Sequence, residues 1–322
     1  MRSIEVVALA FVVSTLGSAC ALPASEEADR FREGLPLQQE VALRVPGGAS
    51  ATNAARPRSA GLRIATGTGG GETARYYQLT RDLTGAVDFG TAVILGGVWS
   101  IVHSAPTTLE PKKAVWGPGA GNALEPAVWR FTVHEIGDAE YDYVLEGQPR
   151  GGGAWLTVMK GHGYGKSRSE HKQGWFEVDN DAYKALEPTR GKDEGTTKVT
   201  YDLRQIPATI AVELRPEASK GWADVKVTHA QAGAGSVEIT SLGDLDESKA
   251  TALEDIHLVS RWTSDGSGRA DVSMKNGDLP FTVDATECWS ASFARVYYKD
   301  TVDFEPQTGA PGVCAFTGSP AP

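Results

Sequence analysis

The sequence predicts a mainly β protein, in which a curved antiparallel sheet or half-open barrel packs on one long helix. Runs of alternating apolar and polar residues fill the chain after residue 126, as expected for strands with one buried face. Turn sequences such as residues 265–268 (DGSG) and 276–278 (NGD) separate the runs at intervals of about 10 to 15 residues, which indicates hairpins. One long segment, residues 72–102, has the period of a helix instead.

The expected strands follow one another without intervening long helices, so an antiparallel sheet is favoured over a parallel one. A short helix is expected at residues 179–187, with Asp179 or Asn180 as its cap and Pro188 after its end. Residues 106–126 are rich in turn formers. The expected strands are residues 129–133, 141–145, 155–160, 174–178, 197–203, 209–214, 223–228, 236–240, 256–262, 270–274, 281–285 and 292–298.

The long helix has apolar residues at helical spacing but also several glycines. Gly85, Gly90, Gly96 and Gly97 each cost about 1 kcal/mol relative to alanine, so a break or two helices is expected. Residues 92–102 are apolar all round, which predicts a buried core helix; a membrane span needs about 20 such residues. Closing the sheet on this helix would bury both apolar faces. The spaced residues are Tyr76, Leu79, Leu83, Val87, Ile94, Val98 and Ile101.

The N-terminus has the order of an export signal: Arg2, an apolar run at residues 6–16, and small residues before Cys20. Cys20 resembles the acylated cysteine of a bacterial lipobox, although Gly17 stands where such motifs usually carry leucine. Cleavage by an ordinary signal peptidase next to Ala19 or Ala21 is the alternative. Either reading predicts an exported protein, and acylation places it in the cell envelope, periplasm-facing or at the surface of the outer membrane.

The expected organisation is a signal peptide at residues 1–20, a tether at 21–60 and a single β-rich domain at 61–322. Residues 21–60 mix proline, alanine, serine and charge, which is typical of linkers. Within the tether, residues 39–45 alternate well enough to form a short strand that docks on the domain.

The chain has three cysteines. If Cys20 carries lipid, Cys288 and Cys314 remain as an even pair and a candidate disulfide. In an oxidising compartment, closing that loop would contribute roughly 3 to 4 kcal/mol on the chain-entropy estimate. Two buried thiols are the alternative.

Charge argues against nucleic acid as a partner. The net charge is −10, and acidic and basic residues are mixed along the chain, so no basic stripe could follow a phosphate backbone. The composition, 41% hydrophobic and 22% charged, is that of a folded domain.

Three near-motifs fail on spacing or context. Residues 160–167 (KGHGYGKS) end like a P-loop, but the spacing is one residue short and a strand follows where a helix is needed. Residues 134–138 (HEIGD) resemble a zinc-protease pattern, but they are expected at a strand end and turn. Residues 244–248 (DLDES) suggest a calcium loop, but Lys249 stands where the loop needs glycine. No catalytic residue, metal site or cofactor is therefore predicted.

Aromatic residues gather in the strand-rich half of the chain. Core packing is the simpler explanation; the alternative is a cavity for an apolar ligand between sheet and helix. The expected lining of such a cavity is Tyr141, Tyr143, Trp155, Trp262, Phe281 and Tyr297.

The C-terminal segments 287–290 (ECWS), 293–298 (FARVYY) and 314–316 (CAF), with Arg261-Trp262 and residues 174–182, resemble uncharacterised bacterial envelope lipoproteins over roughly residues 72–316. That group implies no activity. The order of elements alone is also similar to LolA/LolB-like lipoprotein carriers, and a fold analogy does not establish function.

These observations favour a non-enzymatic envelope lipoprotein, structural or partner-binding, held at the membrane by its lipid anchor. A carrier of a lipid or other apolar molecule is the alternative, and an envelope hydrolase acting on glycans comes third. A carrier needs an apolar cavity, whereas a hydrolase needs two carboxyl groups across a cleft.

Overall fold

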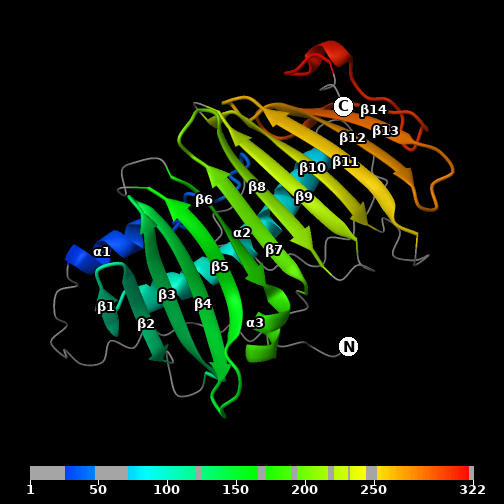
Figure 1. The fold of residues 1–322 in the computed structure, drawn as a ribbon. Helices are drawn as coiled ribbons and strands as arrows, with labels where there is room; N and C mark the ends of the chain where they lie inside the picture. The colour runs from blue at the N-terminus through cyan, green and yellow to red at the C-terminus, as the bar shows by residue number, and fades with distance from the viewer. Residues whose placement is uncertain are drawn as a thin grey trace, which may run out of the picture.

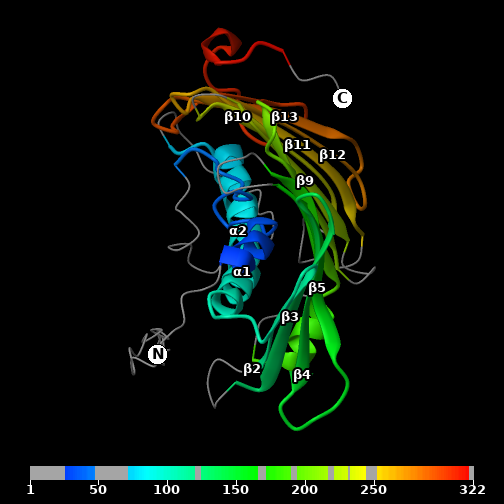
Figure 2. The same cartoon turned by 60° about the vertical axis from the view of Figure 1, so that its left-hand side comes forward.

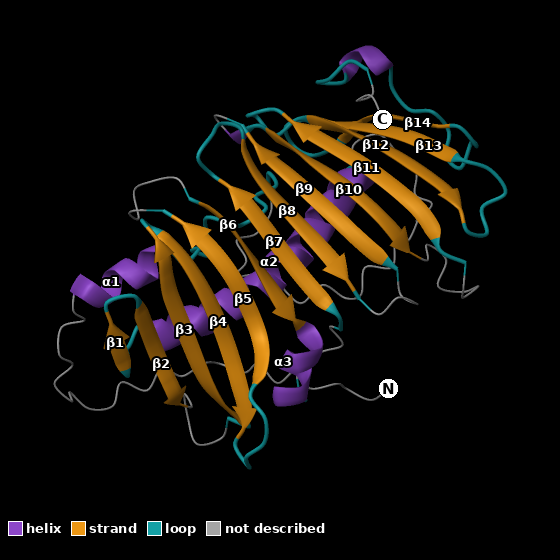
Figure 3. Cartoon of the chain, viewed as in Figure 1, coloured by secondary structure: helices purple, strands orange, loops and turns teal. Residues whose placement is uncertain are grey.

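The computed structural model describes residues 26–47, 72–119, 125–165, 172–189, 194–216, 221–230, 233–243 and 252–318. In this part of the chain fourteen strands form one unclosed antiparallel sheet, and each strand pairs with the next in chain order (Figure 1). The predicted fold class is confirmed: a curved, half-open sheet wraps around one long helix, as Figure 3 shows.

The helices are α1 (Glu26–Glu33), α2 (Arg75–Val102) and α3 (Asn180–Leu186), with a 3-10 turn at Pro311–Val313. The strands are β1 (Thr108–Glu110), β2 (Lys113–Gly119), β3 (Ala127–Gly137), β4 (Glu140–Pro149), β5 (Leu156–Tyr164), β6 (Gln173–Asp179), β7 (Thr196–Asp202), β8 (Ala208–Arg215), β9 (Trp222–His229), β10 (Gly235–Gly243), β11 (Glu254–Trp262), β12 (Gly268–Asn276), β13 (Val283–Trp289) and β14 (Arg295–Asp300).

Alternation along each strand separates a buried concave face from an exposed convex face. On β4, Tyr141, Tyr143 and Leu145 are buried on the concave side, while Asp142 and Glu146 lie on the other side. All twelve expected strands appear in order as β3 to β14, with the last two displaced toward the C-terminus. The alternation of apolar and polar residues was therefore enough to predict these strands, because one face of each strand is exposed to solvent.

Helix α2 lies across the concave face (Figure 2). Its N-terminal end contacts β11 to β13 and its C-terminal end contacts β2 and β3, so it joins the two ends of the sheet. Helix α2 is one long, bent helix that stays continuous from Arg75 to Val102, so it is not divided into two helices. A Cβ atom at any of its four glycines would meet no described atom within 4 Å, so these glycines face away from the sheet.

Residues 26–47, expected as tether, carry α1 and side chains packed into the main core. Phe31 is fully buried, and Leu35 and Leu43 are 1% exposed. The strand expected at residues 39–45 is wrong: this run has turns and irregular extended backbone, although it docks on the domain as expected. The remaining parts of the predicted signal peptide and tether lie outside the described residues.

Residues 34–47 run alongside α2 in the opposite direction. The Trp99 Nε1 donates to the Pro36 carbonyl at 3.1 Å, and the Leu43 amide donates to Asp88 Oδ1 at 2.8 Å. The Tyr77 hydroxyl donates to the Pro46 carbonyl at 2.7 Å. On the sheet side, the buried Lys172 Nζ donates to the Leu35 carbonyl at 3.0 Å. This segment therefore fills the concave face together with α2.

The turn-rich stretch before residue 126 contains two strands that the sequence did not predict. In β2, Ala114 and Trp116 are fully buried and alternate with half-buried neighbours, but Gly117-Pro118-Gly119 obscures the pattern. The short helix is confirmed as α3, because the Asp179 carboxylate accepts the Ala182 amide at 2.8 Å as a cap. The disulfide between Cys288 and Cys314 is also confirmed, with Cα atoms 5.4 Å apart.

The substitution Phe31→Ala tests whether residues 26–47 belong to the folded body. Phe31 packs edge-on against Tyr141, so its removal should lower the free energy of unfolding by about 3 to 5 kcal/mol. Denaturant unfolding of the purified protein measures this. Phe304→Ala is the control, because Phe304 is 46% exposed and should cost less than about 1 kcal/mol. Equal small effects would show that this segment only rests on the surface.

Candidate functional sites

The structure describes one of the three near-motifs in full and another in part. Residues 134–138 span the end of β3 and the turn to β4, so His134 and Asp138 are not one helical turn apart. Residues 160–165 continue β5, and the rest of that motif lies outside the described residues, as do residues 244–248 and Cys20. Among the described residues, no group of three or more histidine, cysteine or acidic side chains could hold a metal ion.

The six aromatic residues expected to line a cavity are not brought together. Tyr141, Tyr143 and Trp262 are buried on the concave face, the first two on β4 and the third on β11, at separate places in the sheet. Tyr297 lies on the convex side, beside the disulfide. Trp155 is half-buried under the Arg130 guanidinium, 4.4 Å from the ring centre, and Phe281 is 53% exposed before β13.

The concave face is occupied by the chain itself. One continuous cluster of buried side chains extends from Phe31 and Leu35 through the strands to Trp289. Tyr143 and Tyr201 illustrate how closed this interior is, since burial raises the pKa of both phenols well above 10. The hydrophobic interior of the described residues is therefore a packed core.

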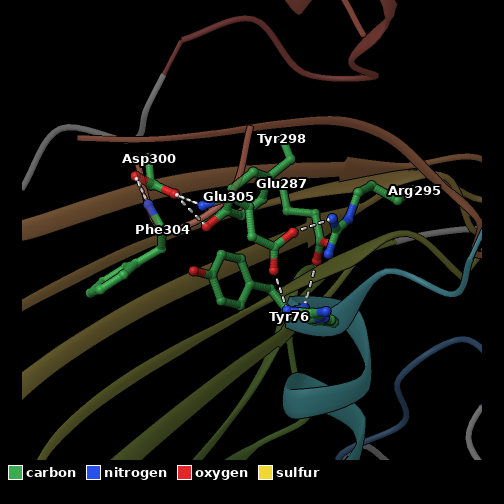
Figure 4. A network of polar contacts seen from close by, with 8 residues as sticks. Tyr76, Glu287, Arg295, Tyr298, Asp300, Phe304 and Glu305 are labelled. Carbon is green, nitrogen blue, oxygen red and sulfur yellow. Dashed lines mark hydrogen bonds and ion pairs between the residues drawn. The ribbon is translucent and has the colours of Figure 1, made fainter. Parts of the chain in front are cut away.

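A buried polar network holds the N-terminus of α2 (Figure 4). The N-cap residue of α2 is Ala74, which has no side chain able to cap the helix. Instead, Glu287 on β13 accepts the Tyr76 amide at 2.5 Å and the Arg295 Nε at 2.7 Å. A carboxylate at a helix N-terminus is favoured by the unpaired amides and the helix dipole. Glu287 thus caps the helix from the sheet.

The network continues into the segment after β14. The Arg295 Nη1 donates to Glu305 at 2.7 Å, and Glu305 also pairs with Arg75 on α2. Asp300 accepts the amides of Val302, Phe304 and Glu305 at 2.9, 3.2 and 3.2 Å, so it shapes the turn that brings Glu305 back. The charged groups of this network are thus paired with one another or with backbone amides. We call the set Glu287, Arg295, Asp300, Glu305 and Arg75 the structural lock, because it joins the start of α2 to the last strands of the sheet.

Burial shifts the pKa of two groups in this network upward. It raises the pKa of the Glu287 carboxyl, while the Tyr76 amide and the Arg295 guanidinium oppose that rise. Burial also raises the pKa of Tyr76 to about 12, so this phenol stays neutral near pH 7. The sequence contained no pattern for the lock, because Glu287, Arg295 and Tyr76 meet only in the folded chain.

A half-buried acid, Asp88, lies on the side of α2 that faces residues 34–47. Asp88 accepts the Leu43 amide, and burial raises its pKa to about 6, although Arg44 favours the charged form. Its neighbours along this face include Thr80 and Thr84, and the Thr80 and Ser260 hydroxyls lie 2.5 Å apart. Polar contacts therefore join α2 to residues 34–47 through Asp88 and to the sheet through Thr80.

The convex face has a hollow of about 450 Å³ over β11 to β14. Most of its lining residues have charged or hydroxyl side chains, among them His257, Asp271, Asp284, Tyr297 and Lys299, although apolar atoms make up the larger part of its accessible surface. The hollow is therefore a mixed surface that offers both apolar contact and polar groups.

The C-terminal segment is fastened to the same convex face. The Cys288–Cys314 disulfide holds it, and the Arg269 and Arg261 guanidiniums donate to the carbonyls of Phe316 and Gly318 at 3.3 and 2.8 Å. Tyr297, which lines the hollow, also packs against the disulfide. The disulfide therefore helps to shape one side of the hollow.

The chain matches no model of a known protein family, no curated protein and no solved structure. The resemblance to bacterial envelope lipoproteins therefore stays a prediction.

The substitution Glu287→Ala should lower the free energy of unfolding by about 3 to 5 kcal/mol, because it uncaps α2 and removes a buried partner of Arg295. Urea unfolding measures this. Glu213→Ala is the control: Glu213 is 45% exposed, 3.5 Å from Arg215, and should cost less than about 1 kcal/mol. If both variants unfold like the wild type, the lock does not hold the helix.

Asp88 predicts a pH dependence of stability. Its folded pKa of about 6 lies above the ordinary value of 3.8, so the folded state binds more protons between these values. Stability contributed by the neutral carboxyl is therefore present below about pH 4 and is lost as pH rises through about 6. Asp88→Asn keeps an oxygen for the Leu43 amide and removes the charge. It should raise stability at pH 7 by up to about 3 kcal/mol.

Thermal unfolding between pH 4 and pH 7 measures this effect, and Asp82→Asn is its control. The Asp82 side chain is 57% exposed on the other side of the same helix, so that variant should follow the wild type. An Asp88→Asn protein with an unchanged pH profile would contradict the raised pKa.

Proposed function

We propose that this chain is an exported cell-envelope lipoprotein, acylated on Cys20, that acts without catalysis by binding a protein partner. The leader and the cysteine after it support export and anchoring. The structural lock and the filled core support a rigid body rather than an active site, because their polar groups are committed to one another. The expected partners are thus the membrane, through the anchor, and an envelope protein.

The hollow on β11 to β14 carries the partner-binding part of this proposal. It is large enough for a side chain or a short loop of another protein. Asp284, Lys299 and Thr301 on its lining are exposed, so they are available to a partner, while β12 and β13 beneath them are paired on both sides. Polar groups on a rigid sheet provide specificity.

The two alternatives find less support. A carrier would have to displace residues 34–47, since they and α2 lie side by side and fill the concave face. A glycan hydrolase could use Asp271 and Asp284, which lie diagonally on neighbouring strands. Asp271, however, accepts hydrogen bonds from Arg269 at 2.7 Å and from Thr286 at 2.7 Å, so its oxygens already serve the sheet.

A photo-crosslinking amino acid placed at Thr301, on the hollow, should join the protein to one distinct envelope protein in intact cells. The same group at Thr200, which is exposed on the convex face of β7 away from the hollow, should not. Gel analysis and mass spectrometry of the adducts identify the partner. Charge reversal by Lys299→Glu should reduce the Thr301 adduct about tenfold or more, since a partner charge is then repelled.

Acylation is tested in the same cells by labelling with radioactive palmitate, which should be lost in Cys20→Ala. Equal adducts at Thr301 and Thr200 would argue against the hollow as the binding surface. An apolar small molecule copurifying in native mass spectrometry, released by organic extraction, would instead favour the carrier.

A further inference from the structure

Residues 309–318, here called the tail, are a surface segment that the disulfide joins to the convex face. Within the tail, Cys314 is buried, Phe316 is half-buried, and the other residues are exposed. The 3-10 turn of the tail, Pro311–Val313, buries no side chain. Exposed residues remove little apolar surface from water, so they contribute little to holding a segment in place. The order of the tail therefore depends on the covalent bond at Cys314.

The disulfide lies outside the main core. Cys288 and Cys314 form a small buried cluster with Tyr297, and this cluster is separate from the main core of the described residues. Strand β13, which carries Cys288, is hydrogen-bonded to β12 on one side and to β14 on the other. Breaking the disulfide would thus release the tail and leave the sheet and the main core in place.

Strand register places the disulfide beside the hollow. One row of directly opposed residues on β12, β13 and β14 consists of Arg269, Cys288 and Tyr297. Two residues further along each strand, and so on the same face, the next row consists of Asp271, Thr286 and Lys299. All residues of this second row line the hollow, as does Tyr297. The disulfide and the hollow therefore occupy neighbouring rows of one face.

Hydrogen bonds also join the tail to the hollow. The Phe316 carbonyl accepts Arg269 Nη1 at 3.3 Å, and the Gly318 carbonyl accepts Arg261 Nη2 at 2.8 Å. The Arg261 guanidinium also lies 5.1 Å from the centre of the Phe316 ring. Arg269 donates to Asp271 at 2.7 Å, and Arg261 lies 3.6 Å from the same carboxylate. The tail thus fixes two guanidiniums that hold a carboxylate of the hollow.

We propose that the Cys288–Cys314 disulfide is a redox switch for partner binding at the hollow. The closed bridge keeps the hollow in its binding form, and reduction releases the tail and weakens binding. For the partner, this inference rests on the proposed function. Release of the tail uncovers the Tyr297 ring and removes an acceptor from each guanidinium, so one wall of the hollow becomes mobile. A surface that must be ordered during binding binds less tightly, because ordering costs free energy.

The reductant of this switch is a dithiol, which supplies two electrons. One thiolate of the dithiol attacks the Cys314 sulfur, since Cys314 keeps 9% of its surface exposed and Cys288 keeps none. The disulfide bond breaks, and Cys288 leaves as a thiolate that takes up a proton. The second thiolate of the dithiol then displaces Cys314, which also takes up a proton. The products are two thiols in this chain and a disulfide in the reductant, so the step is reversible.

Hydrogen exchange on the full chain, purified in detergent, tests whether reduction releases the tail. The Val313 and Cys314 amides donate to the carbonyls of Ala310 and Pro311 at 3.1 and 3.3 Å, so their exchange reports the order of the tail. Dithiothreitol should accelerate exchange in residues 309–318 about tenfold or more and leave β9 and β10 unchanged. A bridge that stays closed in dithiothreitol, a tail that stays protected, or a loss of protection throughout the sheet would overturn the proposal.

Photo-crosslinking at Thr301 in intact cells tests the effect on the partner. The double variant Cys288→Ser, Cys314→Ser should form about fivefold less adduct, or less still, per molecule of protein. Val313→Ala is the matched control: the Val313 side chain is 56% exposed in the tail, so the adduct should change less than about twofold. An adduct that is unchanged or increased in the double variant would overturn the proposal.

The two measurements separate this inference from the proposed function. If the wild-type protein forms no adduct at Thr301, the proposed function fails and the control of binding fails with it. Hydrogen exchange then still decides whether reduction releases the tail. If the wild-type adduct forms and the double variant keeps it, the proposed function stands and the redox switch is wrong.

Discussion

The attachment of α2 to both ends of the sheet is the constraint on which the rest of the structure depends. Every strand pairs with its neighbour in sequence, so strand pairing gives β1 no contact with β14. Helix α2 supplies that connection: Glu287 and Arg295 hold its start beside β13, and Trp116 on β2 donates to the Ser104 carbonyl just after its end. An open sheet of this size would otherwise twist freely and expose its concave face.

A single helix is narrower than the sheet, so α2 alone cannot cover the concave face. Residues 34–47 cover the rest of it, running beside α2 in the opposite direction, and the buried Lys172 binds their backbone. The Lys172 ammonium also lies 3.5 Å from Glu40, so its buried charge has a partner from the same segment. The segment and the helix thus form one unit, and any ligand beneath them must compete with this packing.

Much of the fold could be predicted because most strands have one buried and one wet face, which the sequence records as alternation. Strand β2 was missed since Gly117-Pro118-Gly119 hides the alternation of Ala114 and Trp116. Residues 26–47 were assigned to a tether because their composition is that of a linker. Their burial depends on contacts such as Pro36 with Trp99, 63 residues apart, and no local pattern reports these.

The candidate sites were harder to predict, because they too depend on contacts between residues far apart in the sequence. The disulfide followed from an even pair of cysteines, but the aromatic residues gave no information on which face each would take. Tyr297 lies on the convex face and Tyr298 on the concave one; Tyr298 is buried and hydrogen-bonded to Asp300, and a bulge lies between Cys288 and Trp289 on the partner strand. Neighbouring residues of one strand thus point to opposite faces: Tyr297 lines the hollow, and Tyr298 contacts the structural lock.

The glycines of α2 connect stability with surface chemistry. In an isolated helix they would each cost about 1 kcal/mol, and packing at the two ends is what keeps α2 continuous. Because they face outward, they add nothing to the core, and alanine there would strengthen the helix without touching the sheet. A helix whose inner face is fixed to both ends of the sheet gives the body two different sides, with the hollow of the convex face on the side away from the helix.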